Sequence, residues 1–349
     1  MEIARRQLGE NTRAVHLPPP PETAQRPLGT PVYRTAAWAF SSAEEYAAVL
    51  NDQVPGYSYS RIDNPTVDAF ARAVAALEGA NLSRWPAAQG FASGMAAISG
   101  VFLAFARAGA HVVASAAVYG GTYSLLRNVL TRFGVETDFV DITDLDAVRA
   151  AVRPATRIIY AETIANPTTA VADLRQLAEI AHERGALLVI DTTLAPPVIC
   201  RPLEHGADLV VHSATKYIGG HSDVTGGVVT GSLELIGQIR ATRIDTGGSL
   251  SPDDAFQLRR GHRPGSGPLL DRPRRRGGPH QRRLRRPGKP LPAGLAPRNR
   301  TAFRIMDLTL RQSFSRWSTA NIFGLTDVSL PVLRRLRLAG REHQQTEFA

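Results

Sequence analysis

The sequence predicts an α/β fold in which a mostly parallel central sheet is covered by helices on both faces. From about residue 65 to residue 260, short apolar runs alternate with longer segments whose apolar residues recur every three to four positions. Short β-rich runs separated by helices of this length are typical of parallel sheets, because each parallel connection needs a crossover. Ligands of such sheets bind beyond the carboxyl ends of the strands.

The expected elements follow in order along this region. Thr66 can cap a helix that ends at Gly79, and a second helix starts near Gly94. The expected strands are 111–115, 135–140, 157–162, 186–191 and 208–213. Further helices are expected at 122–134, 144–152 and 173–185. Residues 1–60 have weak periodicity and a proline run, which predicts an extended N-terminal arm.

The composition changes abruptly at Gly261. Residues 261–300 hold eight prolines, seven glycines and no apolar period, which predicts neither a helix nor a buried strand. They also hold twelve basic residues against one acid, so the net charge of +10 comes from this tract and the rest of the chain carries about −1. Residues 261–349 are therefore interpreted as an aberrant C-terminal region. A shift of reading frame near Gly261 is our hypothesis for its origin.

The composition bears on two classes of partner and on the location of the chain. A basic tract can bind nucleic acid through phosphates, but this one lacks interleaved aromatic residues, and no nucleic-acid partner is expected. No run of about 18 apolar residues exists, so no membrane partner is expected. The N-terminus lacks the apolar core of a secretory signal, and Cys200 is the only cysteine, which suits the cytoplasm.

Lys216 is the first candidate catalytic residue. The chain has only one other lysine, Lys289, and makes its remaining cationic side chains with arginine. A surface lysine is the usual interpretation of such a residue. Here an amine that can lose its proton and attack an aldehyde explains the choice better, because arginine cannot form an imine. Lys216 is therefore expected to form a Schiff base.

Residues near the expected strand ends complete a pyridoxal-phosphate site. Asp191 can hold the pyridine nitrogen protonated, although an aspartate that caps a turn is about as common. The helix start at Ser93, Gly94 and Met95 offers free N–H groups to a phosphate, although small residues open many helices. Ser213 and Thr215 add hydroxyl groups to the same phosphate, and Tyr119 can stack on the ring, although Tyr-Gly-Gly is more often a turn.

The loop around Lys216 also holds residue types that can bind a metal. His212, His221 and Asp223 are possible metal ligands, but they lie among glycines that are better explained by tight turns. No metal is expected.

Six motifs resemble the Cys/Met-metabolism family of pyridoxal-phosphate enzymes, which includes cystathionine γ-synthase, cystathionine lyases, methionine γ-lyase and O-acylhomoserine sulfhydrylases. The motifs are GYSYSRIDNPT, ASGMAA, VYGGTYS, ETIANPT, VIDTTLAPP and HSATKYIGGHSDVTGG. The resemblance implies the aspartate-aminotransferase-type fold, known as fold type I, for residues 61–260. It also implies pyridoxal 5'-phosphate as the cofactor.

The resemblance implies a role for each matching residue. Lys216 matches the Schiff-base lysine, Asp191 the partner of the pyridine nitrogen, and Tyr119 the stacking tyrosine that assists deprotonation. The phosphate cradle within the subunit is matched by Gly94, Met95, Ser213 and Thr215. Asn166 matches an asparagine near the phenolic oxygen. Tyr59 and Arg61 match a pair that reaches the phosphate of a neighbouring subunit, and Tyr57 is a looser match nearby.

The resemblance implies elimination or replacement at Cβ or Cγ of sulfur amino acids or O-acylhomoserine, within cysteine metabolism or methionine biosynthesis. Shared active sites imply a homodimer or homotetramer. The alternative is a catalytically dead remnant, because the Ser-Leu-Gly-Gly element and the late substrate-binding arginine of the family are not recognisable after Gly261. Gly121 stands where methionine γ-lyases typically have cysteine, which favours the other members of the family. Synthase, lyase and sulfhydrylase stay open, because the residues that discriminate between them in the family normally lie in the region after Gly261.

Overall fold

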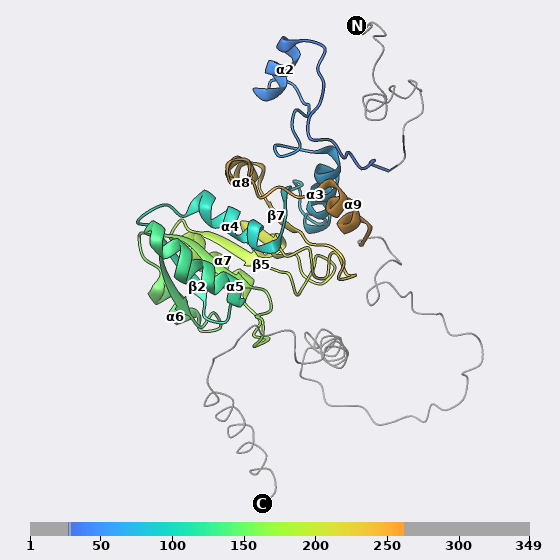
Figure 1. Ribbon diagram of the computed structural model, residues 1–349. Helices are drawn as coiled ribbons and strands as arrows, with labels where there is room; N and C mark the ends of the chain where they lie inside the picture. The colour runs from blue at the N-terminus through green and yellow to red at the C-terminus, as the bar shows by residue number, and fades with distance from the viewer. Residues whose placement is uncertain (1–26, 28, 262–349) are drawn as a thin grey trace, which may run out of the picture. The chain divides into compact units, whose positions relative to one another are not determined.

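A computed structural model of the chain describes residues 27 and 29–261, and these belong to one compact unit (Figure 1). The aberrant C-terminal region expected at residues 261–349 lies outside the described residues except for Gly261 itself. Most of the first half of the expected N-terminal arm also lies outside them.

A seven-stranded sheet forms the centre of the described unit, in the order β1-β7-β6-β5-β4-β2-β3. Its strands are β1 (Ala87–Phe91), β2 (His111–Ser115), β3 (Glu136–Val140), β4 (Thr156–Glu162), β5 (Leu187–Asp191), β6 (Leu209–His212) and β7 (Gly227–Gly231). Strand β7 pairs antiparallel with both of its neighbours, and the other pairs are parallel. The predicted mostly parallel sheet is confirmed.

The α-helices are α2 (Ala43–Leu50), α3 (Pro65–Glu78), α4 (Gly94–Phe105), α5 (Gly120–Ser124), α6 (Leu145–Ala151), α7 (Leu174–Glu183), α8 (Leu233–Thr246) and α9 (Pro252–Gly261). Helices α4 to α7 connect strands, whereas the other helices precede β1 or follow β7 (Figure 1). Helix α2 lies within the predicted extended arm, and Ser42 caps it by accepting the Glu45 N–H. The arm is therefore not extended throughout.

The predicted cap of α3 was wrong by two residues. Asn64 is the cap and accepts the Thr66 N–H, because Pro65 at the first helical position has a φ fixed for the helix and needs no acceptor. Thr66 lies inside the helix, where its hydroxyl donates to the Pro31 carbonyl.

The predicted helix at 122–134 is helical but divided. Helix α5 passes into a π-helical turn at Leu125–Val129 and a 3₁₀ turn at Leu130–Phe133, which ends at Gly134 with φ of 75°. A left-handed backbone at that position favours glycine.

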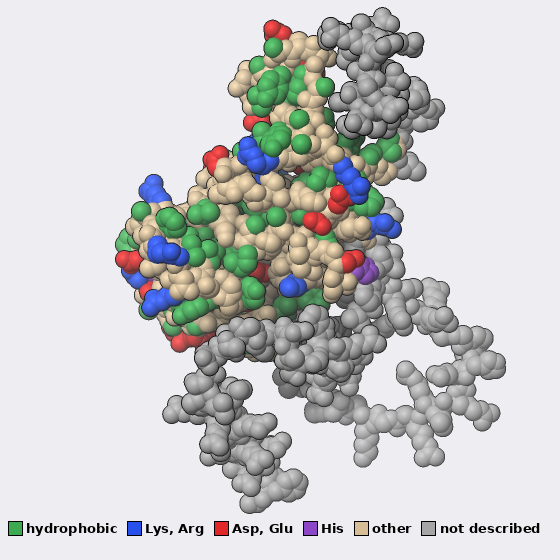
Figure 2. Space-filling view, viewed as in Figure 1, with side chains coloured by type: hydrophobic (Ala, Val, Ile, Leu, Met, Phe, Trp, Pro, Cys, Tyr) green, Lys and Arg blue, Asp and Glu red, His purple; other side chains and the backbone are tan. Residues whose placement is uncertain are grey.

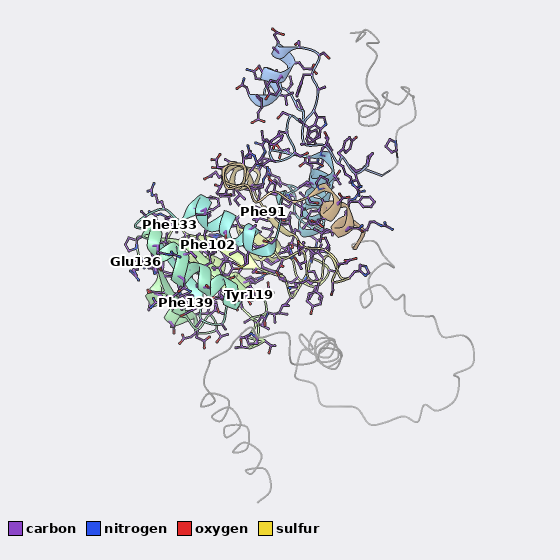
Figure 3. The ribbon with its side chains drawn as sticks, in the orientation of Figure 1. Phe91, Phe102, Tyr119, Phe133, Glu136 and Phe139 are labelled. Carbon is purple, nitrogen blue, oxygen red and sulfur yellow. The ribbon has the colours of Figure 1, made fainter. Side chains whose placement is uncertain are left out.

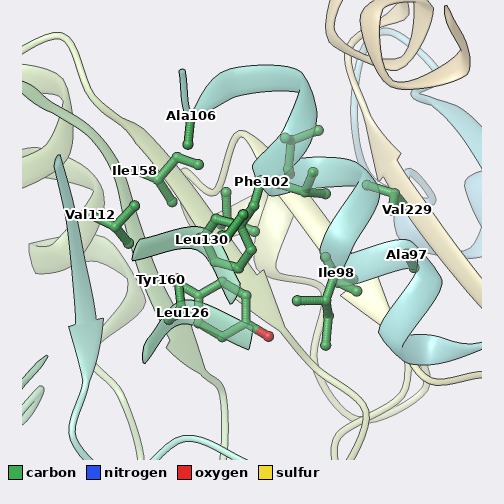
Figure 4. Close-up of a cluster of buried hydrophobic side chains, with 14 of the residues drawn as sticks. Ala97, Ile98, Phe102, Ala106, Val112, Leu126, Leu130, Ile158, Tyr160 and Val229 are labelled. Atoms are coloured by element: carbon green, nitrogen blue, oxygen red, sulfur yellow. The ribbon is translucent and has the colours of Figure 1, made fainter. Parts of the chain in front are cut away.

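Alternate residues of the strands enter two different cores. In β4, Ile158 and Tyr160 pack with Phe102 of α4 on one face of the sheet (Figure 4). Ile159 and Ala161 point to the other face and pack in the cluster that contains Leu177 of α7. Both faces of the sheet are therefore buried, which explains the unbroken apolar runs of these strands.

Candidate cofactor site

Polar residues gather at one edge of the sheet. Strand β1 runs parallel to β6, because each pairs antiparallel with β7. The carboxyl ends of β1, β2, β4, β5 and β6 therefore share an edge. The segments that leave this edge carry the predicted site residues Ser93, Gly94, Met95, Tyr119, Asn166, Asp191, Ser213, Thr215 and Lys216.

The start of α4 lies against the segment that follows β6. Ser93 caps the helix by accepting the Ala96 N–H, and a Cβ added at Gly94 would lie 2.6 Å from Ser213 Cβ and 2.7 Å from Ser213 Oγ. The N–H groups of Gly94 and Met95 have no acceptor within the helix because they belong to its first turn. Free N–H groups beside a hydroxyl at a helix start fit the phosphate of the implied cofactor.

Gly94→Ala is expected to damage this cradle. The new methyl group would also come within 2.9 Å of the Ser213 Cα, so the backbone itself must shift. We expect a loss of about 1–3 kcal/mol in the free energy of unfolding, measured by urea denaturation, and weaker binding of pyridoxal phosphate. Gly237→Ala is the control, because no atom lies within 4 Å of its added Cβ inside α8. Equal effects of the two variants would contradict the close approach.

Asp191 is buried at the end of β5. Its Oδ2 accepts the Tyr160 hydroxyl at 3.3 Å, and its Oδ1 accepts the Thr193 N–H at 2.9 Å. Burial raises the pKa of Asp191, while hydrogen bonds from Thr193 and the nearby His212 oppose that rise. The carboxylate is thus desolvated and suited to a cationic partner such as a protonated ring nitrogen.

Thr193 links Asp191 to the phosphate cradle. While its N–H donates to Asp191, its Oγ1 accepts the Ser213 N–H at 2.8 Å. Thr193 was not predicted as a site residue, because the DTTLAPP segment does not show that its hydroxyl would lie beside the segment that follows β6.

Tyr119 lies at the start of α5, where its side chain is half exposed (Figure 3). A Cβ added at Gly121 would lie 2.5 Å from Tyr119 Cε1 and 3.0 Å from Met95 Sδ. The structure therefore brings Tyr119 and Met95 together, with glycine between them. A side chain at position 121 would require the Tyr119 ring to move.

Glu162 ends β4 directly beside Asp191 in the strand register. Its carboxyl group accepts the N–H of Tyr119 at 2.6 Å and the N–H of Asn166 at 2.9 Å. Burial, the largest cause, and the charge of Asp191 raise the pKa of Glu162, while the two backbone hydrogen bonds lower it, and the net result is a pKa of about 7. Glu162 is the last residue of the strand expected at 157–162, but the sequence predicted no role for it.

The stability of the chain is expected to depend on pH through Glu162. The pKa is about 7 in the folded chain against 4.5 for the free group, so the folded state binds the proton more tightly. The free energy of unfolding should fall as the pH rises from 4.5 to 7, by about 3 kcal/mol in total. Urea unfolding between pH 5 and pH 8 should show this slope in the wild type and a flatter profile in Glu162→Gln. Parallel profiles would contradict the assignment.

The lysine lies in a turn that follows β6. Lys216 is exposed, and its backbone N–H donates to the Ser213 carbonyl. Thr215 is less available than predicted, because its Oγ1 accepts the Gly226 N–H at 3.0 Å and donates to the Gly226 carbonyl at 3.2 Å. A phosphate bond to Thr215 would replace its bond to the carbonyl.

Tyr59 and Arg61 lie on the segment before α3, and Arg61 contacts α8. Arg61 donates to the Ile244 carbonyl, and its guanidinium lies 5.6 Å from the Tyr59 ring. The buried Arg243 of α8 binds the carbonyls of Arg61 and Ile62. The structure does not bring this pair to the Asp191 edge of the same chain.

Tyr57 has its own partner: its hydroxyl donates to Asp68 at 2.8 Å.

His212 pairs with Glu78 rather than with His221 or Asp223. Its Nε2 lies 2.7 Å from Glu78 Oε1 in a buried pair, and the described residues hold no group of three or more possible metal ligands.

Lys and Arg side chains are scattered over the face that Figure 2 shows rather than gathered in a patch. Within residues 27 and 29–261, no helix is long and apolar enough to cross a membrane.

Comparisons with known proteins agree with the geometry. The model of the family described as Cys/Met metabolism PLP-dependent enzyme matches residues 11–264. L-Methionine gamma-lyase of Pseudomonas putida is 43% identical over 255 residues, which cover 72% of this chain and 63% of that protein. Cystathionine gamma-lyase of Bacillus subtilis is 43% identical over 235 residues, which cover 67% and 58%.

A solved structure shares the fold. Cystathionine gamma-lyase from Lactobacillus plantarum, complexed with L-serine, superposes with a TM-score of 0.60 and 38% identity over 66% of this chain and 57% of that one. The chain spans less than two thirds of the length of these relatives.

Proposed function

The chain belongs to the Cys/Met-metabolism family of pyridoxal-phosphate-dependent enzymes, and we propose that it catalyses elimination or replacement at Cβ or Cγ of a sulfur amino acid or an O-acylhomoserine. One observation carries the proposal: the same edge of the sheet holds the desolvated carboxyl of Asp191, the Gly94–Ser213 cradle, Tyr119 and Lys216. The relatives named as γ-lyases support elimination as the reaction.

Each site residue has a proposed task. Pyridoxal phosphate, when bound, supplies an electron sink that stabilises negative charge on the substrate's Cα. The Lys216 amine holds the cofactor and carries a proton between substrate carbons, and Asp191 accepts the hydrogen bond of the ring nitrogen. Tyr119 stacks on the ring and assists deprotonation. The remaining ligands are the N–H groups of Gly94 and Met95 and the hydroxyls of Ser213 and Thr215 for the phosphate, and Asn166 for the phenolic oxygen.

A shared active site is part of the proposal. Tyr59 is exposed, and Arg61 lies on a segment fixed by Arg243 rather than at the Asp191 edge. Both are free of the site in their own chain, which supports a role at the phosphate of a neighbouring subunit in a homodimer or homotetramer. The lone Cys200 supports a cytoplasmic location.

The second candidate is a catalytically dead remnant of such an enzyme. The family match ends at residue 264, close to the change of composition at Gly261, and the relatives are longer than the matched region. A shift of reading frame near Gly261 would replace the part that anchors the substrate carboxylate. Resequencing the coding region tests this origin, and an unbroken reading frame would overturn it.

A substrate panel separates the two candidates. The purified chain, supplied with pyridoxal phosphate, is incubated with methionine, with cystathionine, and with O-acetylhomoserine plus a thiol. Formation of a 2-oxo acid or a new thioether above the background of Lys216→Ala supports the enzyme. Cofactor binding without turnover supports the remnant, and a folded chain that binds no cofactor contradicts the proposed site.

A further inference from the structure

One buried carboxyl group joins two segments that are far apart in the sequence. The Glu162 Oε1 accepts the N–H of Tyr119, which follows β2, and Oε2 accepts the N–H of Asn166, which follows β4. Glu162 is 6% exposed, so water does not compete for these bonds. The carboxyl therefore sets the distance between the two backbones.

Tyr119 depends on this bond more than on packing. Its side chain is 49% exposed, and as the residue before α5 it makes no side-chain capping bond. The Tyr119 ring and the Met95 sulfur both lie beside Gly121. The hydrogen bond from the Tyr119 N–H to Glu162 is thus a main restraint on the position of the Tyr119 ring.

The position of Glu162 is costly, which argues against a role in stability alone. The titratable side chains that interact with it are Asp191 on β5 and Tyr160 on its own strand. Burial and the charge of Asp191 both disfavour the ionised form of Glu162, and Glu162 with Asp191 in turn disfavours ionised Tyr160. A cation bound at Asp191 would reduce this repulsion and favour the carboxylate that accepts both N–H groups.

We propose that Glu162 is a positioning residue that couples Tyr119 to Asn166, so that the stacking ring and the ligand of the phenolic oxygen are placed as one unit. This inference rests on the proposed function, because it takes the cofactor roles of Tyr119 and Asn166 from it. Ionised Glu162 holds both segments, and protonated Glu162 accepts one of the two N–H groups poorly.

Hydrogen exchange of the cofactor-free chain tests the coupling directly. In Glu162→Gln at pH 8, peptides that contain Tyr119 and Asn166 should both exchange at least about tenfold faster than in the wild type. Asp144→Asn is the matched control, because Asp144 also accepts two backbone N–H groups, at an exposed helix start. It should leave both peptides unchanged. Faster exchange of one peptide alone, or of neither, overturns the coupling.

The wild type provides a second measurement that does not depend on a variant. The two N–H bonds favour the ionised carboxyl, so protonation favours a local opening that breaks them while Glu162 stays buried. After correction for the intrinsic effect of pH on exchange, both peptides should therefore lose protection between pH 8 and pH 5.5, while peptides around Ala147 should not. Unchanged protection of both peptides overturns the proposal even if Glu162→Gln fails to fold.

Cofactor binding then separates this inference from the proposed function. Glu162→Gln should bind pyridoxal phosphate at least about tenfold more weakly and show a weaker circular dichroism of the cofactor band. Unchanged affinity and band with a folded variant overturns the positioning role. If the wild type binds no better than Lys216→Ala while both peptides still respond, the proposed function falls and the coupling stands.

Discussion

Lys216→Ala is expected to abolish covalent attachment of pyridoxal phosphate and to lower any turnover by about 10²–10⁴-fold, the usual contribution of a positioned proton carrier. The methyl group of alanine can neither hold the cofactor nor accept a proton. The cradle at Gly94 and Ser213 would remain, so loosely bound cofactor can persist. Reduction with borohydride followed by peptide mass analysis should find the cofactor on the Lys216 peptide of the wild type and on no peptide of the variant.

The sequence offers an unusually clean control for this experiment. Lys289 is the only other lysine of the chain, so Lys289→Ala tests the general loss of a lysine amine. It should retain both the attachment and the turnover. Attachment at Lys289 in the wild type, or equal turnover of wild type and Lys216→Ala, would contradict the role of Lys216.

Strand identity could be predicted where the run is rich in branched or aromatic apolar residues. Runs such as ALLVID and RIIYAE are continuous apolar stretches, and β5 and β4 lie there. Strands β1 and β7 were not predicted because AAQGF and GVVTG are short and rich in small residues, a composition that also fits loops. Their pairing depends on partners distant in sequence, which local pattern cannot show.

The same limit applies to the site. The rule that ligands bind at the carboxyl ends of parallel strands placed Asp191 and Ser213 at one edge, and the structure agrees. The bonds that connect this edge join residues 43 apart, as for Tyr119 and Glu162, or 20 apart, as for Ser213 and Thr193. Their partners follow from strand order, which a single sequence does not reveal. Glu162 and Thr193 were missed as supporting residues for this reason.

Asp191→Asn is expected to raise the stability of the cofactor-free chain while it lowers turnover by about 10²–10³-fold, the usual effect of removing one electrostatic partner. Burial raises the pKa of Asp191 above its ordinary value of 3.8, so the folded state favours the neutral form. The free-energy penalty of burying ionised Asp191 grows as the pH rises through the pKa of the unfolded state, and it is complete above the pKa of the folded state. Asparagine has no charge to desolvate and can still accept the Thr193 N–H.

Melting curves at pH 8 and initial rates with saturating pyridoxal phosphate measure the two effects. The midpoint of the cofactor-free variant should rise by about 2–4 °C for each 1 kcal/mol of penalty removed. Asp173→Asn, which keeps the cap of α7 through its bond to the Gln176 N–H, should change neither quantity. A variant that loses stability and activity together would make Asp191 a structural acceptor for Thr193 and Tyr160. If stability rises while activity falls, the charge of Asp191 serves a cationic ligand, because a carboxylate that only supports the fold would not destabilise it.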